Sequence, residues 1–276
     1  MTVWNRKAET KMRILVRGGG DLASGVVVRL HRAGWQVLVT ELARPLAVRR
    51  YVSFAEAVYD GEISIEGVRG LRIDRLDDVN PSIADGVVPV LVDPSLESLA
   101  RFEPHVLIDG RMTKRPPETD IGAAPLVIGL GPGFTAGVDC HAVVETNRGP
   151  AMGRVLWEGQ AQADTGVPER VAGYQVERVL RAPADGVIEP FVEIGNLVSA
   201  GDLIAEVAGE PVIAAFDGVV RGLIKPGLKI RAGEKIGDID PRGDPRLCWM
   251  VSDKALAVAG GVLEAILSWK PVRKFV

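Results

Sequence analysis

The feature that most constrains the fold is residues 13–25, RILVRGGGDLASG, where a short apolar run leads through three glycines into an amphipathic segment. Residues 14–16 are typical of a strand buried in a parallel sheet, and Gly18, Gly19 and Gly20 allow a tight turn. Apolar residues then recur at helical spacing up to Gly34, which suits a helix end. The segment predicts a strand, a glycine turn and a helix whose first N–H groups favour an anion.

The residues that follow extend this pattern to a dinucleotide fingerprint. Gly18, Gly20 and Ala23 have the spacing G-x-G-x-x-A, and a second apolar strand at 37–41 ends in Glu41, where ribose-binding acids of that motif lie. A carboxylate at Asp21 would repel a phosphate, so we expect Asp21 to cap the helix instead. One hypothesis is therefore a nicotinamide-dependent oxidoreductase that binds NAD(P).

Strand and helix patterns alternate through the first 180 residues. We expect a helix at 46–58, an antiparallel pair at 62–66 and 71–74, a strand at 88–93, a helix at 94–102, and strands at 105–111 and 125–134. This order predicts an α/β fold with a Rossmann-like, mostly parallel sheet. Ligands of such sheets lie beyond the carboxyl ends of the strands. The residues expected at this rim are 18–21, 41–45, Asp93, 109–114 and 129–135.

A second glycine-rich loop follows the last of these strands, at 129–137. Such a loop can direct several N–H groups at one ligand, so Gly131, Gly133, Phe134 and Thr135 are candidates for a second anion cradle. Two cradles at one rim imply a ligand with more than one phosphate. A plain tight turn is the alternative.

Basic residues follow two of the strand ends. Arg111 and Lys114 come after Asp109, and Arg44 and the pair Arg49-Arg50 come after Glu41. Arginine side chains match phosphate geometry, although charge clusters also occur on solvated faces. His141 and Arg148 follow the second glycine loop and are further candidates, whereas we interpret Cys140 as a buried, inert thiol. We find no cluster with the spacing of a metal site.

The second half of the chain contains an internal repeat. Residues 181–207 match 213–239 at an offset of 32, which pairs Asp185 with Asp217, Ala200 with Ala232 and Gly201 with Gly233. Neither half can bury its own apolar face, so both must share one core. The pattern resembles the barrel-sandwich hybrid of biotinyl and lipoyl domains. The turn at 208–212 holds no lysine to modify, so we interpret this all-β barrel as a structural or docking element.

The totals describe an ordinary globular chain of 276 residues with 47% hydrophobic residues. A net charge of −3 gives no reason to expect nucleic acid, and two cysteines without metal-ligand spacing suit a reducing compartment. We expect no secretory signal, no membrane partner and a cytoplasmic location. The expected segments are a loose extension at 1–12, the Rossmann-like domain at 13–180, the barrel at 181–245, and a C-terminal helix and tail at 246–276. Gly260 and Gly261 inside that helix predict close packing against another backbone.

Five stretches together resemble a known family. VRGGGDLASG, LARPLAVRRYVSFAEAVYDG, GLGPGFTAGVDCHAVVETNRG, the lysine-free repeat and AGGVLEAIL resemble the YqeB-like proteins of the selenium-dependent molybdenum hydroxylase system, whose N-terminal part is akin to the XdhC/CoxF maturation factors. The resemblance implies an accessory role in maturing, modifying or delivering molybdenum cofactor, with molybdenum hydroxylases or other maturation proteins as partners. The ligand contacts that it implies are Gly18, Gly20, Asp21, Glu41, Arg44, Gly131, Gly133, Phe134, Thr135, His141 and Arg148.

Three hypotheses follow from the sequence. The first is an accessory protein whose glycine-rich rim binds molybdopterin or its dinucleotide. The second is the NAD(P)-dependent oxidoreductase, and the third is a non-enzymatic docking protein built around the barrel. The sequence leaves open whether a reaction is catalysed and whether the chain forms a homo-oligomer.

Overall fold

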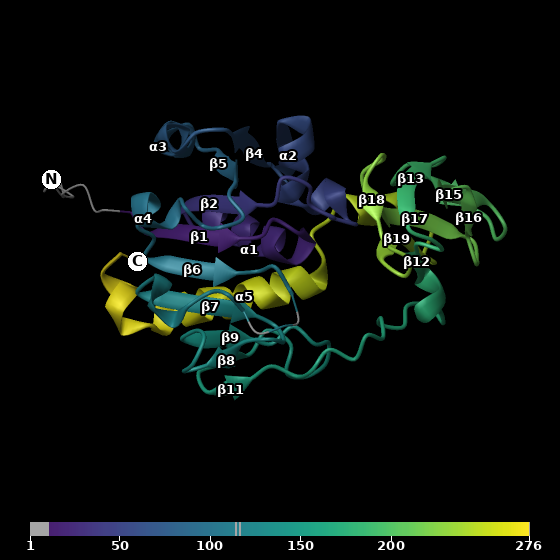
Figure 1. Cartoon of the computed structure of the whole chain (residues 1–276). Coiled ribbons are helices and arrows are strands. Elements are labelled where there is room, and N and C mark those ends of the chain that lie inside the picture. The colour runs from purple at the N-terminus through teal and green to yellow at the C-terminus, as the bar shows by residue number, and fades with distance from the viewer. Residues whose placement is uncertain (1–10, 114, 116, 276) are drawn as a thin grey trace, which may run out of the picture.

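The computed structural model describes residues 11–113, 115 and 117–275, which form an α/β domain and a smaller β domain beside it (Figure 1). Of the extension expected at 1–12, residues 1–10 lie outside this part. Met12 is fully buried, so the α/β core already begins there. No helix among the described residues has the length and apolar character needed to cross a bilayer.

The α/β domain is built on a nine-stranded sheet in the order β10-β9-β7-β6-β1-β2-β5-β4-β3. Neighbouring strands run parallel, except that β3 and β10 at the two edges pair antiparallel with β4 and β9. This confirms the α/β fold with a mostly parallel sheet and the antiparallel pair expected after residue 61. The strands are β1 (Arg13–Arg17), β2 (Gln36–Glu41), β3 (Glu62–Ile65), β4 (Val68–Ile73), β5 (Val88–Val92), β6 (Val106–Asp109), β7 (Leu126–Leu130), β9 (Ala142–Val144) and β10 (Val155–Leu156).

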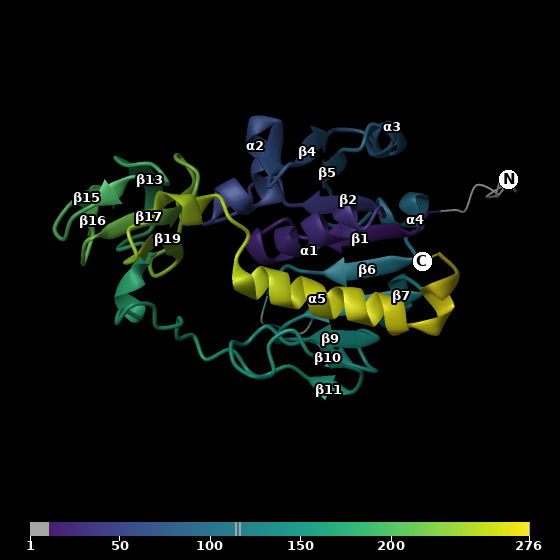
Figure 2. The same ribbon diagram turned by 180° about the vertical axis from the view of Figure 1, so that it is seen from behind.

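Helices α1 (Asp21–Arg32) and α5 (Asp253–Ser268) lie side by side over one face of this sheet (Figure 2). They approach closely because Gly25 has no side chain: a Cβ there would lie 2.6 Å from Cβ of Ala255. Gly261 approaches the carbonyl oxygen of Gly153 in the same way, whereas nothing lies near Gly260. The expected close packing therefore applies to Gly261 alone, and the helix of the segment expected at 246–276 belongs to the α/β core.

The opposite face of the sheet is covered by shorter elements. They are α3 (Val79–Ala84), α4 (Leu99–Phe102) and the two-stranded pair of β8 (Thr135–Ala136) with β11 (Gly159–Gln160). The helix expected at 94–102 is reduced to α4, because the Asp93 carboxylate accepts the N–H groups of Glu97 and Ser98 at 2.9 Å and holds a turn before it.

The helix expected at 46–58 does not form. Short 3-10 turns, η1 (Arg50–Val52) and η2 (Phe54–Glu56), lead instead into α2 (Ala57–Asp60). Hydrogen bonds to distant residues replace the backbone hydrogen bonds of a helix here. The N–H of Ala55 donates to the carbonyl of Gly19, and the N–H of Phe54 donates to Oγ of Ser24. The apolar pattern of this segment therefore reflects contacts with two neighbours and not one helix face.

The β domain consists of two four-stranded sheets, ordered β12-β19-β17-β14 and β16-β15-β13-β18. The repeat is visible in its bonds, since Asp185 accepts the N–H of Ala232 at 2.7 Å and Asp217 accepts that of Ala200 at 2.8 Å. The strands are β12 (Val179–Arg181), β13 (Gly186–Pro190), β14 (Leu197–Val198), β15 (Leu203–Val207), β16 (Glu210–Ile213), β17 (Gly218–Leu223), β18 (Lys229–Ile230) and β19 (Lys235–Asp240). The lysine-free turn at 208–209 joins β15 to β16.

The β domain docks on residues 48–60, which we call the docking segment. The N–H of Leu223 donates to the carbonyl of Val48 at 2.8 Å, and Nε of Arg50 donates to the carbonyl of Leu223 at 3.0 Å. Lys225 binds Glu56 at 2.9 Å and also pairs with Asp60. The docking segment, which follows β2 in the chain, therefore holds the barrel against the α/β domain through these contacts.

Candidate functional site

A cavity of about 520 Å³ lies beyond the carboxyl ends of β1, β2, β5 and β6. The chain passes from β1 to β2, continues to β3 at the edge of the sheet, returns inward through β4 and β5, and then crosses to β6 on the other side of β1. A crevice at such a reversal is where open α/β sheets bind ligands. The cavity is therefore our candidate site.

One wall of this cavity is the start of α1. Gly18 has φ +91°, and Gly20 is the N-cap residue with open space where a Cβ would be. The N–H groups of Asp21 and Leu22 have no acceptor among the described residues, as at the start of any helix. Thr40 is 1% exposed, yet its Oγ1 has no hydrogen-bond partner there. This wall thus offers unused donors and a hydroxyl to a ligand.

Glu41 closes the same wall at the end of β2. Its two carboxylate oxygens accept the N–H groups of Gly19 and Leu42, each at 2.7 Å. Burial raises the pKa of Glu41, although these two bonds oppose that shift. Each oxygen keeps a lone pair for another donor, such as a ligand hydroxyl.

The arginines at the ends of β1 and β6 are largely neutralised by the protein itself. Arg111 binds Asp109 through two hydrogen bonds of 3.0 and 2.8 Å, and Asp109 is 1% exposed. Arg17 donates to Thr119 and Glu118, and burial lowers the pKa of Arg17. Arg111 therefore shapes the cavity wall more than it adds charge to it, and Asp109 is not among the lining residues.

Another part of the wall is apolar, although Arg49 and Lys235 also line the cavity. Leu42 and Leu46 are 50% and 47% exposed, unusually high for leucine, and both line the cavity. Pro45, Ala47 and Met112 continue this surface. The cavity thus combines an apolar surface with several polar groups.

The second glycine loop does not reach the cavity, which corrects the expectation of two cradles at one rim. A Cβ on Gly131 would overlap Oγ1 of Thr146, and one on Gly133 would lie 2.6 Å from the carbonyl oxygen of Arg115. These glycines allow close packing of chain segments, not access for a ligand. Phe134 is 1% exposed in the core, and Thr135 lies in β8 and accepts a bond from Gln160.

Three further candidates lie elsewhere. His141 is at the opposite end of the sheet, where its Nδ1 accepts the N–H of Val127 near the start of β7. Arg148 pairs with Asp253 between the two domains, and Arg44 is exposed and does not line the cavity. Lys114 lies outside the described residues.

We expected Asp21 to cap α1, but its side chain makes no capping hydrogen bond. Its carboxylate instead lies 3.6 Å from the guanidinium of Arg49, which also donates to the carbonyl groups of Leu247 and Met250. Arg49 therefore ties the start of α1 to the segment after the barrel. Arg17, the last residue of β1, and Thr40, the residue before the end of β2, were not predicted from the sequence, although both adjoin residues that were.

The described residues contain no group of three or more histidine, cysteine, aspartate or glutamate side chains arranged to hold a metal ion. Both cysteines are buried and free, and burial raises the pKa of Cys140 to about 12. The thiols are therefore unsuited to act as nucleophiles.

Comparison with known proteins identifies one informative relative. The chain is homologous to the uncharacterized protein YqeB of Escherichia coli (strain K12), with 45% identity over 254 residues. These residues make up 92% of this chain and 47% of YqeB, so the chain spans about half the length of its curated relative. No family model matches the chain.

Similarity to solved structures is weak. An aspartoacylase family protein from Mesorhizobium loti is 12% identical, with 83% of this chain and 85% of that chain covered and a TM-score of 0.28. The product-bound ectoine utilization protein EutE (DoeB) from Ruegeria pomeroyi is 24% identical over 30% of this chain and 27% of that chain, with a TM-score of 0.22. Scores this low assign no activity.

Proposed function

We propose that the chain is an accessory protein for molybdenum hydroxylase maturation that binds molybdenum cofactor, as molybdopterin or its dinucleotide, in the cavity at the start of α1. The observation that carries the proposal is the pairing of unused helix N–H groups and the unpaired Thr40 hydroxyl with an apolar wall at Leu42 and Leu46. The resemblance of the glycine turn and the repeat to the YqeB-like proteins of that system directs the choice of ligand.

The residues of the cavity fit such a ligand. The N–H groups of Asp21 and Leu22 would hold a phosphate, because the helix dipole and unpaired amides both favour an anion. The pterin ring would lie on Leu42 and Leu46, and Thr40 would bond its polar edge. The bound cofactor would supply the molybdenum chemistry of the hydroxylase, while this chain would hold and orient it. A molybdenum hydroxylase or another maturation protein is the proposed partner.

A NAD(P)-dependent oxidoreductase is the second candidate, and Glu41 is the observation that favours it. Its carboxylate lies at the end of β2, beside the glycine turn, where a dinucleotide fold places its ribose contact. Against it, the cavity wall contains no histidine, tyrosine or cysteine among the described residues, so a proton would have to move with the hydride through another group such as Glu41, Asp93 or Lys235.

The first experiment is a binding titration of the full chain with molybdopterin, with its dinucleotide and with NAD⁺, alongside mass spectrometry of any ligand that copurifies. We expect affinity for a form of molybdenum cofactor. Tight binding of NAD⁺ with no affinity for either cofactor form would overturn the proposal and favour the oxidoreductase.

Gly20→Asp tests the position of the ligand. Gly20 has φ −65° and ψ 172°, a conformation that suits aspartate or serine as the N-cap residue. The new carboxylate would occupy the place of the phosphate, so we expect at least a tenfold loss of cofactor affinity, or about 1.4 kcal/mol. Gly20→Ser is the matched control, since it caps the helix without charge. Equal binding by Gly20→Asp and Gly20→Ser would show that the phosphate does not lie at α1.

A further inference from the structure

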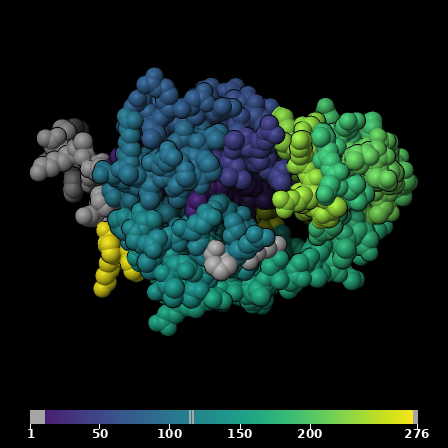
Figure 3. Space-filling view, viewed as in Figure 1, coloured from purple at the N-terminus to yellow at the C-terminus, as the bar shows by residue number. Residues whose placement is uncertain are grey.

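A second hollow lies between the two domains (Figure 3) and has a volume of about 1050 Å³. We call it the interdomain cleft. Residues from the start of α1, the docking segment, the linker before the barrel, the barrel itself and the start of α5 line it. It adjoins the cavity at Asp21, Arg49 and Lys235, but most of its wall belongs to other elements.

The wall of the interdomain cleft is strongly basic. Eight arginine and lysine side chains line it, against five aspartate and glutamate side chains. Asp240 adds one more negative charge behind the wall, where it binds Arg242 through hydrogen bonds of 2.9 and 2.6 Å. The wall and Asp240 together thus carry two more basic than acidic side chains.

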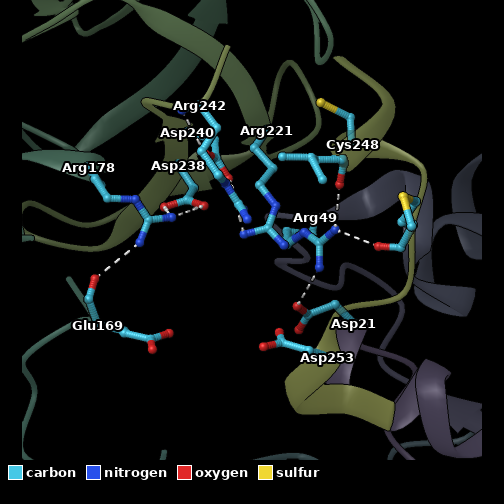
Figure 4. A network of polar contacts seen from close by, with 12 residues as sticks. Asp21, Arg49, Glu169, Arg178, Arg221, Asp238, Asp240, Arg242, Cys248 and Asp253 are labelled. Carbon is cyan, nitrogen blue, oxygen red and sulfur yellow. Dashed lines mark hydrogen bonds and ion pairs between the residues drawn. The ribbon is translucent and has the colours of Figure 1, made fainter. Parts of the chain in front are cut away.

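The excess of positive charge is most evident at Arg221. Its guanidinium makes no hydrogen bond to a described residue, and its one ion pair there joins it to Asp240 at 3.6 Å. Burial and the neighbouring Arg49 lower the pKa of Arg221, and Arg242 acts in the same direction, whereas Asp238 and Asp240 oppose the shift. Figure 4 shows the guanidinium groups of Arg221 and Arg49 next to each other, with Arg242 close by.

Two other arginines of the wall also have unused donors. Arg49 and Arg178 are 8% and 5% exposed, and the Nε atoms of Arg49, Arg178 and Arg221 are buried without a hydrogen-bond partner in the described part of the chain. Lys254 likewise makes no hydrogen bond or ion pair to a described residue, and burial lowers its pKa. Arg49 and Arg178 have other partners, but a buried Nε donor without an acceptor is costly, and grouped guanidinium groups of this kind favour an anion between them.

We propose that the interdomain cleft is a second binding site, for a compact anion of the phosphate or pyrophosphate type, held by Arg221 together with Arg49 and Arg242. Such an anion carries two or more charges and several acceptor oxygens, which match the forked donors of adjacent arginines. Since Arg221 and Arg242 belong to the barrel and Arg49 to the docking segment, the anion would bridge the two domains. The barrel then contributes to binding without any lysine to modify.

The test is a calorimetric titration of the full chain with inorganic pyrophosphate, repeated with sodium chloride at matched ionic strength. We expect saturable binding of pyrophosphate, an affinity at least tenfold lower in Arg221→Met, and little change in Arg231→Met. Arg231 is an exposed barrel arginine that does not line the cleft, so it controls for loss of charge alone. Equal affinity in Arg221→Met and wild type, or an equal effect of chloride, would overturn the proposal.

Two further variants keep the test decisive. If Arg221→Met loses its thermal melting transition, Arg221→Lys replaces it, with an expected loss of at least threefold because an ammonium lacks the planar fork. Gly20→Asp separates the two sites. Pyrophosphate binding that is lost in Gly20→Asp and kept in Arg221→Met would place the anion in the cavity and refute the site in the cleft.

Discussion

Gly260 and Gly261 are adjacent in α5, but the structure predicts opposite effects when each is changed to alanine. Gly260 is exposed, and nothing lies within 4 Å of the place that a Cβ would take there. A Cβ on Gly261, in contrast, would overlap the carbonyl oxygen of Gly153 and lie 2.8 Å from Cγ1 of Val144. Both substitutions gain about 1 kcal/mol of helix propensity. Only Gly261→Ala must also push two packed segments apart.

The magnitude follows from these two contributions. Forcing a methyl group into a packed core costs about 1–3 kcal/mol, so Gly261→Ala should lower the free energy of unfolding by up to about 2 kcal/mol. Gly260→Ala should raise it by about 0.5–1 kcal/mol. The free energy of unfolding should therefore differ between the two variants by about 1–3 kcal/mol.

The assay is urea unfolding of wild type and both variants, followed by circular dichroism, with the slope of the transition compared to verify that the unfolding reaction is unchanged. If Gly261→Ala is as stable as Gly260→Ala, then α5 does not contact the backbone at Gly153 as described. The placement of α5 in the α/β core would then have to be revised.

Three other perturbations have defined outcomes. At pH 8, thiol reagents should label neither Cys140 nor Cys248 rapidly in the native chain and both after denaturation, because burial raises the pKa of both thiols; fast native labelling would show that they are accessible. Hydrogen bonds from Arg148 lower the pKa of Asp253. This ion pair therefore stabilises the fold fully above the ordinary aspartate pKa of about 4, and its contribution to stability decreases as the pH falls below that value. Asp253→Asn should thus cost at most about 1 kcal/mol at pH 7 and less at pH 2, and a loss as large at pH 2 as at pH 7 would contradict this cause. Asp185→Ala and Asp217→Ala should each cost about 0.5–1.5 kcal/mol in thermal unfolding and agree within about 0.5 kcal/mol, because each removes the equivalent bond of one repeat; clearly unequal losses would argue against the symmetry.

The sequence was most informative where one physical cause produces one pattern. The runs at 14–16, 37–41 and 126–130 are apolar because both faces of a central parallel strand are covered, so the sheet could be predicted. The repeat could be predicted too, because its paired aspartates and glycines make the same turn twice.

Where one residue type serves several purposes, the sequence was ambiguous. Glycine leaves open space at Gly20 but admits another chain segment at Gly131 and Gly133, and the spacing is similar in both loops. Apolar residues of the docking segment contact α1 on one side and the barrel on the other, which imitates a helix. The interdomain cleft depends on how the barrel sits against α1, so no local pattern indicates it.

The position of α5 has a consequence for the order in which the molecule can be completed. The chain leaves the α/β domain after β11, forms the whole barrel, and only then returns to lay α5 against α1 (Figure 1). During synthesis from the N-terminus, the apolar face of α1 therefore stays uncovered until the barrel and then α5 have left the ribosome. A chain that ended within the barrel would lack α5, so its α/β sheet would have an exposed apolar face. Nascent chains with such a surface aggregate or recruit chaperones.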